Sequence, residues 1–204
     1  AIQHFNITYE GSTRANLVDE ELLSTMAKSG LIRISFGLES ANLAIRELIK
    51  KRVPLDAYQE ANRLANKYGI ETINSVMIGL PGDTPERIQE TISFVRYARE
   101  IKTATLGIAI PYPGSELYEM AKKEMHGLKL LTNDFAKYQR YSSAVMEVNG
   151  MRPNELVRIQ RRGLLAIYLT PRRLIPLLSR FSKRSLFQTF LTTIGKSIRS
   201  KLFE

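Results

Sequence analysis

The chain has 204 residues, of which 44% are apolar and 25% charged, as expected for a globular protein with one core and an appendage. It contains no cysteine, which excludes disulfides, zinc–thiolate sites, a cysteine nucleophile and cysteine-ligated iron–sulfur clusters within these residues. No apolar run approaches the roughly 18 residues that span a bilayer, and no secretory signal is present.

The formal net charge of +10 belongs to the C-terminal end of the chain. Residues 158–204 hold 11 of the 30 Lys and Arg residues and 1 of the 20 Asp and Glu residues. Residues 1–157 are therefore neutral overall, and the sequence describes a neutral domain with a cationic end. His4 and His126 have no partner at metal-ligand spacing, so both are predicted to be structural or exposed to solvent.

The first predicted strand covers residues 5–9, and a loop over residues 10–16 follows it. Residues 1–7 already have the pattern of a strand interior, so we expect the sequence to be part of a longer protein. Asp19 can cap the first helix, which Gly30 ends.

A second strand is predicted over residues 32–36, where Ile32, Ile34 and Phe36 alternate with polar residues. Gly37 follows this strand, and its lack of a side chain would let another group approach the backbone closely. The later predicted elements are helices over residues 44–51, 54–69 and 115–123 and strands over residues 73–78 and 105–110. Asp83 or Thr84 can cap a further helix, and the spacing of Asp83 and Glu86 suits a capping box.

Four strand–helix units in succession predict an α/β fold with a parallel sheet, whose strand ends meet at one rim. Four units cannot close an eight-stranded barrel, so we expect an open curved sheet or a partial barrel. Pro153 marks the change to a helical region with predicted helices over residues 155–168 and 186–203. The predicted domains are residues 1–127, the partial barrel, and residues 128–204, a basic α-helical extension.

Three motifs follow the predicted strands in order. They are Phe36-Gly-Leu-Glu-Ser40, Met77-Ile-Gly-Leu-Pro-Gly-Asp-Thr84 and Pro111-Tyr-Pro-Gly-Ser115. This arrangement resembles the radical S-adenosylmethionine (SAM) superfamily, and especially its cobalamin-associated branch, which includes anaerobic magnesium-protoporphyrin cyclases. The resemblance implies a partial (β/α) barrel of six units, of which this chain holds the third to sixth. A three-cysteine loop for a 4Fe-4S cluster, and any cobalamin domain, would then lie upstream.

The resemblance also implies a SAM site at the strand ends. Glu39 and Ser40 would bind the ribose or the methionyl amine, and Lys51 the SAM carboxylate. Ser75, which shares a predicted strand face with Ile73 and Met77, would reach the ribose. The remaining predicted contacts are Met77 and Ile110 at the adenine, Gly79 through its backbone, and the polar Ser12 and Arg14.

Each of these residues also has an ordinary structural explanation. Glu39 can compensate a helix dipole, Lys51 and Arg14 can be solvated surface cations, and Ser75 can bond to backbone. Met77 and Ile110 can belong to the core, and Gly79 can serve only a tight turn.

The resemblance implies an enzyme that, at full length, reduces SAM to methionine and a 5′-deoxyadenosyl radical and modifies a small molecule by methylation or cyclisation. A lipid-like substrate is one option that the branch offers. Because three thiolates must hold the cluster, this chain alone is predicted to bind none and to leave SAM intact. The alternatives are an RNA-modifying radical SAM methylthiotransferase, against which the helical tail argues, and a truncated, non-catalytic binding or scaffold module.

The basic amphipathic end can pack on the missing N-terminal part of the protein or lie on anionic lipid. It has no basic strand interleaved with aromatic residues, so nucleic acid is the weaker expectation. The predicted location is the cytoplasm, with the inner face of the membrane as an alternative.

Overall fold

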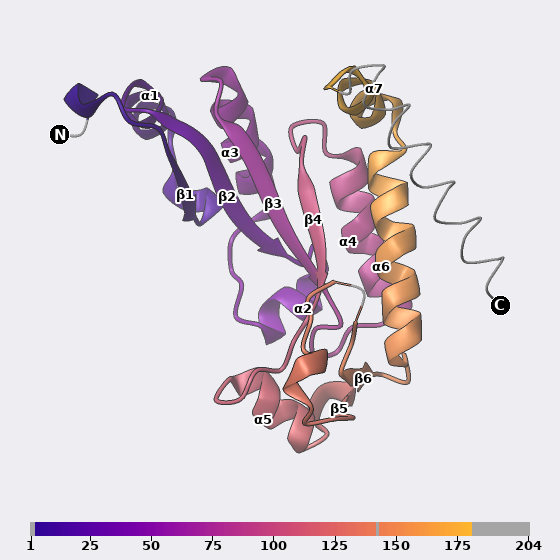
Figure 1. Cartoon of the computed structure of the whole chain (residues 1–204). Coiled ribbons are helices and arrows are strands. Elements are labelled where there is room, and N and C mark those ends of the chain that lie inside the picture. The colour runs from indigo at the N-terminus through magenta and orange to yellow at the C-terminus, as the bar shows by residue number, and fades with distance from the viewer. Residues whose placement is uncertain (1–2, 142, 181–204) are drawn as a thin grey trace, which may run out of the picture. The chain divides into compact units, whose positions relative to one another are not determined.

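Four parallel strands, in the order β1-β2-β3-β4, form the centre of the computed structural model, which describes residues 3–141 and 143–180. Each strand is followed by one or more helices (Figure 1). The strands are β1 (Tyr9–Thr13), β2 (Leu31–Glu39), β3 (Glu71–Ile78) and β4 (Ala104–Ile108). The α/β fold and its partial-barrel sheet are confirmed.

The chain divides into two compact units, Ala1–Ile167 and Tyr168–Glu204. The first contains the sheet, and its helices are α1 (Glu20–Lys28), α2 (Leu43–Leu48), α3 (Leu55–Lys67), α4 (Pro85–Tyr97), α5 (Glu116–Lys122) and almost all of α6 (Pro153–Tyr168). The second contains α7 (Pro171–Arg180). The predicted division after residue 127 stays a prediction, and the predicted helix over 186–203 lies outside the described residues.

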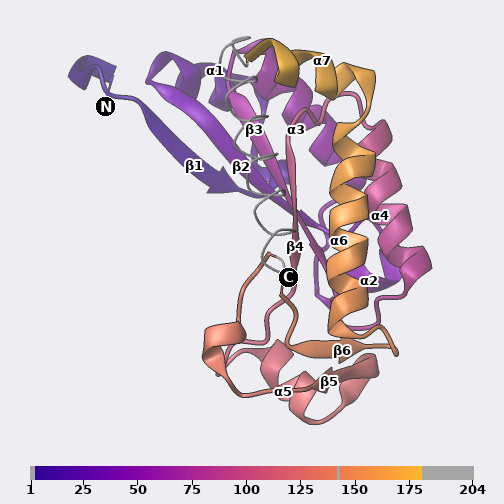
Figure 2. The same ribbon diagram turned by 45° about the vertical axis from the view of Figure 1, so that its right-hand side comes forward.

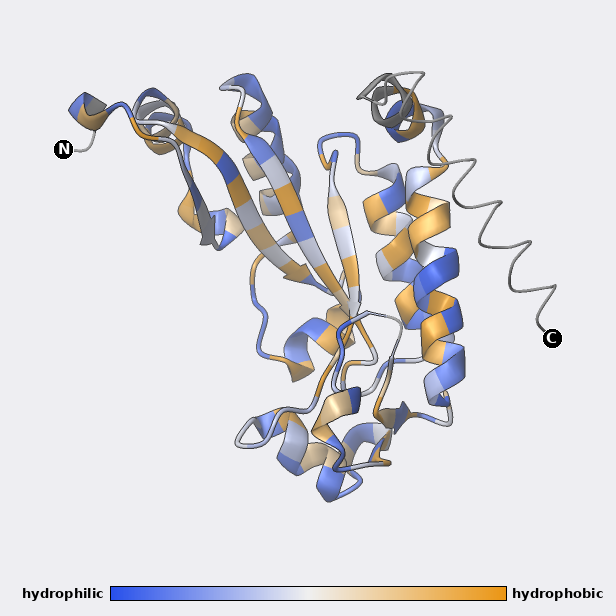
Figure 3. Ribbon diagram, in the orientation of Figure 1, coloured by the Kyte–Doolittle hydropathy of each residue, from blue (hydrophilic) through white to orange (hydrophobic). Residues whose placement is uncertain are grey.

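The two faces of the sheet differ in burial, because side chains alternate along each strand. Phe36, Val76 and Leu106 are fully buried on the face that carries the helices. Figure 3 shows the resulting alternation of apolar and polar residues along β2 and β3. The opposite side, which we call the open face, consists of Arg33, Ser35, Gly37, Ile73, Ser75, Met77, Thr105 and Gly107. Ile32 is 44% exposed, so the predicted alternation of β2 holds only from Ile34 onward.

Helix α6 completes the layer of helices beside β4 and α4, as Figures 1 and 2 show from two sides. A Cβ atom added at Gly163 would lie 2.7 Å from Cδ1 of Ile92 and 2.7 Å from Cδ2 of Leu106. The helix axis can therefore approach the sheet closely only because residue 163 has no side chain. Gln160, one turn earlier, donates a 2.8 Å hydrogen bond to the carbonyl of Leu106.

The helix caps agree with the predictions from the sequence, with one exception. Asp19 accepts a 2.8 Å hydrogen bond from the Leu22 amide at the start of α1. Thr84 caps α4, with Pro85 as its first residue. Asp83 forms no capping box with Glu86; it turns back and accepts a 3.0 Å hydrogen bond from the Leu80 amide.

The first predicted strand is wrong in its position. Residues Gln3–Phe5 form a 3-10 helix, and Asn6 has a positive φ of 50°, which interrupts an extended chain. Strand β1 instead begins at Tyr9 and runs through the predicted loop, because Tyr9–Thr13 pair in register with β2. Ser12 is therefore a strand residue, and Arg14 follows the strand directly.

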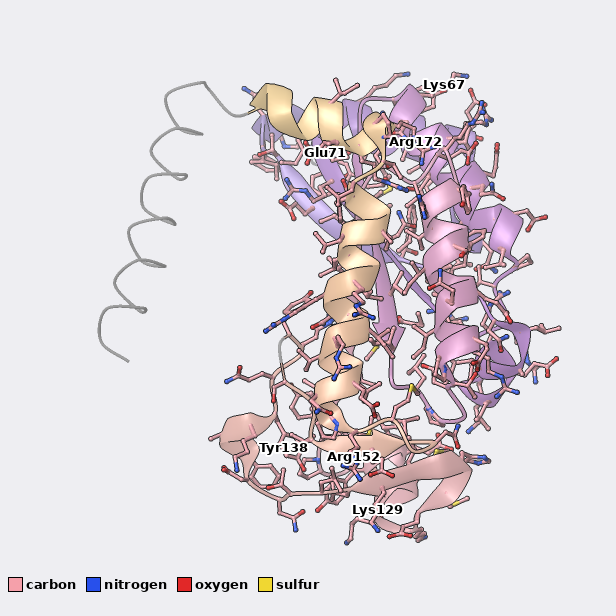
Figure 4. All side chains as sticks on the ribbon, turned by 90° about the vertical axis from the view of Figure 1, so that its right-hand side faces the viewer. Lys67, Glu71, Lys129, Tyr138, Arg152 and Arg172 are labelled. Carbon is pink, nitrogen blue, oxygen red and sulfur yellow. The ribbon has the colours of Figure 1, made fainter. Side chains whose placement is uncertain are left out.

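The sequence also did not reveal a small antiparallel pair, β5 (Leu128–Leu130) with β6 (Met146–Val148), in the region predicted to be helical. It is tied to the turn after β3: Asn149 donates a 2.8 Å side-chain hydrogen bond to the Asp83 carbonyl, and the Gly82 amide donates to the His126 carbonyl. Figure 4 shows Lys129 and Tyr138 at this end of the unit, and Glu71, at the start of β3, at the other.

None of the helices that the structure describes has both the length and the apolar character needed to cross a bilayer.

Candidate functional site

The carboxyl ends of β2, β3 and β4 bring polar side chains together on the open face. Gly37 lies beside Ser75, and Ser75 beside Thr105, in the registers of the two strand pairs. Cross-strand neighbours in a parallel sheet project to the same side. Met77 and Gly107 form the next row toward the rim, so the predicted common face of Ile73, Ser75 and Met77 is confirmed.

Glu39 and Lys51 form an ion pair above this row. Lys51 Nζ lies 3.8 Å from Glu39 Oε1, and both side chains are about three-quarters buried. A Cβ added at Gly37 would lie 2.6 Å from Glu39 Oε1 and 3.2 Å from Lys51 Nζ. Because Gly37 and Ser75 share the open face, Glu39, Lys51 and Ser75 all lie on one side of the sheet. Gly37 provides the space that the ion pair occupies.

The backbone at Glu39 is unusual, because its φ of 62° lies in the left-handed region that a residue with a Cβ rarely adopts. The β2–β3 register also shifts between Gly37 and Glu39. Burial raises the pKa of the Glu39 carboxyl, although the charges of Lys51 and Arg140 act in the opposite direction. This carboxyl group thus sits in a partly desolvated place beside two cations.

Tyr58 of α3 supports the end of β2 from the helix side. Its hydroxyl donates a 2.8 Å hydrogen bond to the carbonyl of Gly37. Burial raises the pKa of Tyr58 to about 12, and the charges of Arg46, Glu39 and Arg14 act on the same hydroxyl. The hydroxyl is therefore a hydrogen-bond donor at neutral pH.

One buried hydroxyl group on the open face, the Oγ1 atom of Thr105, has no hydrogen-bond partner within the described residues. Ser75, its neighbour on β3, is half-buried. A buried hydroxyl without a partner is costly, so a ligand that bonds to it would recover free energy. Thr105 has no signal in the sequence that would single it out.

Arg140 is a second residue that sequence reasoning missed. A Cβ added at Gly107 would lie 2.4 Å from Arg140 Nε and 2.8 Å from its Cγ, so this side chain lies across the glycine on the open face. The Arg140 carbonyl accepts hydrogen bonds from the Ile108 amide and from Gln160, at 3.0 and 3.3 Å. No sequence pattern marks Arg140, because an irregular segment brings it to β4.

The other predicted site residues are placed differently. Ser40 is 1% exposed and lies 3.1 Å from the Thr91 hydroxyl of α4, so it is not brought to the open face. A side chain at Gly79 would point toward Leu156 and Ile108, with nearest atoms at 3.6 and 3.7 Å. Ile110 is half-buried beyond the end of β4.

Ser12 and Arg14 lie at the β1 side of the same face. Ser12 pairs in register with Ser35, which belongs to the open face, and both Ser12 and Arg14 are exposed. The charge of Arg14 reaches the Tyr58 hydroxyl. The structure thus brings Glu39, Lys51, Ser75, Met77 and Ser12 toward one face, while Ser40 and Gly79 point elsewhere. Arg14 follows the end of β1 directly.

Comparison with known families agrees with this arrangement of parallel strands. The model of the radical SAM superfamily matches residues 2–95, which contain β1, β2, β3 and the ion pair. Residues 2–95, nearly half of the chain, thus match the radical SAM superfamily. The resemblance found in the strand-end motifs is therefore confirmed.

The relatives of this chain include enzymes of more than one kind. It is 31% identical over 170 residues to an uncharacterized methyltransferase of Pyrococcus horikoshii, which covers 83% of this chain and 36% of the relative. It is 29% identical to the anaerobic magnesium-protoporphyrin IX monomethyl ester cyclase of Rubrivivax gelatinosus, over 69% of the chain and 24% of the relative. The chain thus spans about a third or less of the length of these relatives.

A solved structure shows the same fold. The radical SAM methyltransferase TsrM from Kitasatospora setae, determined with cobalamin and a [4Fe-4S] cluster, superposes on 74% of the chain with a TM-score of 0.56 and 19% identity. The superposition covers 35% of that structure.

The superfamily implies SAM and a 4Fe-4S cluster, and the residues present fit these two groups unequally. The space at Gly37, the unpartnered Thr105 hydroxyl and the Lys51–Glu39 pair offer what a ribose and an amino acid need. The sequence contains no cysteine, so its residues do not fit the cluster. The described residues also contain no group of three or more His, Asp and Glu side chains that could hold a metal ion.

Proposed function

We propose that this chain binds SAM on the open face and forms the C-terminal part of a radical SAM enzyme that modifies a small molecule. The observation that carries the proposal is the convergence of Glu39, Lys51 and Ser75 beside Gly37, at the carboxyl ends of parallel strands. Ligand sites of α/β proteins characteristically form at this end of the sheet.

Each group has a role that its chemistry supports. Lys51 binds the carboxylate of SAM, and Glu39 accepts hydrogen bonds from the methionyl amine or the ribose hydroxyls. Ser75 and Thr105 bond to the ribose, and the half-buried Met77 and Ile110 flank the adenine. Bound SAM supplies the methyl or 5′-deoxyadenosyl group that radical SAM chemistry uses.

The ligands of the 4Fe-4S cluster would come from protein outside the printed sequence, as would any cobalamin site. A methylation or a cyclisation is the reaction we propose for the longer protein, because the relatives include a methyltransferase and a cyclase. Which of the two occurs depends on parts that this chain does not contain.

Equilibrium binding of SAM and of 5′-methylthioadenosine, which lacks the amino-acid part, tests the site on the 204-residue chain. Lys51→Gln should weaken SAM binding roughly tenfold, the loss of one charged hydrogen bond, and leave 5′-methylthioadenosine binding unchanged. Gly37→Ala should weaken both ligands, because the new methyl group displaces the Glu39–Lys51 pair.

Lys50→Gln is the matched control, since Lys50 is exposed and pairs with Glu116 away from Gly37. The proposal is wrong if the chain binds neither ligand, or if Lys50→Gln and Lys51→Gln have the same effect.

The missing cysteines favour one other candidate, a binding or scaffold module without catalysis. Anaerobic assay of the longer protein with a reconstituted cluster separates the two, because only an enzyme forms 5′-deoxyadenosine from SAM.

A further inference from the structure

The carboxyl end of β2 carries more positive charge than the SAM site explains. Four cationic side chains approach it from four segments: Arg14 after β1, Arg46 in α2, Lys51 after α2 and Arg140 after β4. The charges of Lys51 and Arg140 act on the Glu39 carboxyl, and those of Arg46, Arg14 and Glu39 act on the Tyr58 hydroxyl. Within the described residues, only Lys51 among these cations has an ion-pair partner.

Arg46 is the least explained of the four cations. Arg46 is 7% exposed, and its Nε atom is buried without a hydrogen-bond partner among the described residues. Neither an ion pair nor a hydrogen bond engages its guanidinium within that part of the chain. A buried donor without a partner is costly, so an anion that accepts a hydrogen bond from the Arg46 Nε–H would recover free energy.

The position of Arg46 places it near the carboxyl end of β2. Its carbonyl accepts a 2.7 Å hydrogen bond from the amide of Lys51. Its charge acts on the Tyr58 hydroxyl, together with the charge of Arg14, and that hydroxyl bonds to the carbonyl of Gly37. Helix α2 lies just past the ends of the strands in Figure 1. Arg46 and Arg14 therefore flank the same end of β2.

SAM does not balance this charge. Its carboxylate and ammonium cancel, and its sulfonium adds a further positive charge. If Lys51 takes the carboxylate of SAM, Arg46 and Arg14 still have no anionic partner. We propose that the end of β2 also binds the phosphate or carboxylate group of a second ligand, a small anionic substrate, and that Arg46 and Arg14 hold this group. The inference rests on the proposed function and narrows its substrate class.

Thermal unfolding and calorimetric titration of the whole chain with pyrophosphate and with citrate, at constant ionic strength, test the inference. One or both anions should bind saturably and raise Tm. Arg46→Met and Arg14→Gln should each weaken that binding roughly tenfold to a hundredfold, as expected for one hydrogen bond to a charged group. Arg99→Gln is the control, since Arg99 is exposed before β4, at the opposite end of the sheet. Binding of pyrophosphate alone would indicate that the second ligand carries a phosphate group. Binding of citrate alone would indicate a carboxylate group.

The Tm without added anion tests independently whether Arg46 stabilises the fold. Removal of a buried donor that has no partner should leave Tm unchanged or raise it in Arg46→Met. A clear fall in Tm would mean that Arg46 is structural and would overturn the inference.

Three binding results also overturn it. In the first, neither anion binds while 5′-methylthioadenosine does, which leaves the SAM site intact. In the second, Arg46→Met weakens SAM but neither 5′-methylthioadenosine nor the anions, which assigns Arg46 to the SAM carboxylate. In the third, the chain binds no anion and no nucleoside, and both proposals fail.

Discussion

At the scale of single residues, Asp83 shows how burial and hydrogen bonding compete. Its side chain is 2% exposed in the turn after β3 and accepts the amide of Leu80. Burial raises the pKa of Asp83 to about 7, because the backbone hydrogen bonds and Arg87 offset only part of the cost of a buried charge. The folded protein therefore holds a proton that the unfolded chain releases near pH ~4.

This proton makes stability depend on pH. Between about pH 4 and 7 the native state binds one more proton than the unfolded state, so stability falls as pH rises and levels off above the folded pKa. Asp83→Asn, which stays neutral, should lose this dependence. Urea unfolding should be measured at pH 5, 6, 7 and 8 for both proteins. The free energy of unfolding of the wild type, relative to that of Asp83→Asn, should fall by about 1.4 kcal/mol per pH unit up to pH ~7. A difference that stays constant with pH would contradict the prediction.

Residues at the strand ends could be found from the sequence only where alternation or a motif fixes them. Ser75 follows from the alternation of β3, and Glu39 from a glycine motif at the end of β2. Ser40 shares that motif, but the turn directs it to Thr91. Arg46 and Arg140 could not be found, because a basic residue in a short helix or an irregular segment looks like a surface residue.

At the scale of elements, the contact of α6 with α4 and β4 depends on Gly163. Gly163→Val would place methyl groups where Ile92 and Leu106 lie, and such overpacking costs about 1–3 kcal/mol. Chemical denaturation should show this loss in the free energy of unfolding. Arg162→Val makes the same change at an exposed neighbour, so it should cost only the smaller difference in helix propensity. Equal losses in both variants would argue against close packing at residue 163.

The long elements were predictable for physical reasons that lie within each element. Helix α3, for example, has Tyr58, Ala61 and Leu64 on one buried face and begins after a proline. Strand β1 was misplaced because its residues, Tyr9–Thr13, are mostly polar and depend on pairing with β2. The β5–β6 pair has strands of three residues, too short for a periodic pattern, and depends on contacts with the turn after β3.

At the scale of the whole molecule, the charge of the C-terminal end is the main feature to test. We propose that the basic residues after residue 180 contact anionic lipid, because their positive charge is attracted to anionic headgroups. The full chain should sediment with vesicles containing phosphatidylserine, and a chain ending at residue 180 should sediment less. Neutral phosphatidylcholine vesicles serve as the control, and equal sedimentation of both chains would exclude this role for the segment.

The left-handed backbone at Glu39 has a consequence for the evolution and engineering of this protein. A residue with a Cβ costs on the order of 1 kcal/mol there, whereas glycine adopts this conformation freely. A screen that rewards only heat resistance would therefore enrich glycine at position 39 and discard the carboxylate. Retention of glutamate under such a screen would instead show that its ion pair with Lys51 outweighs the backbone cost.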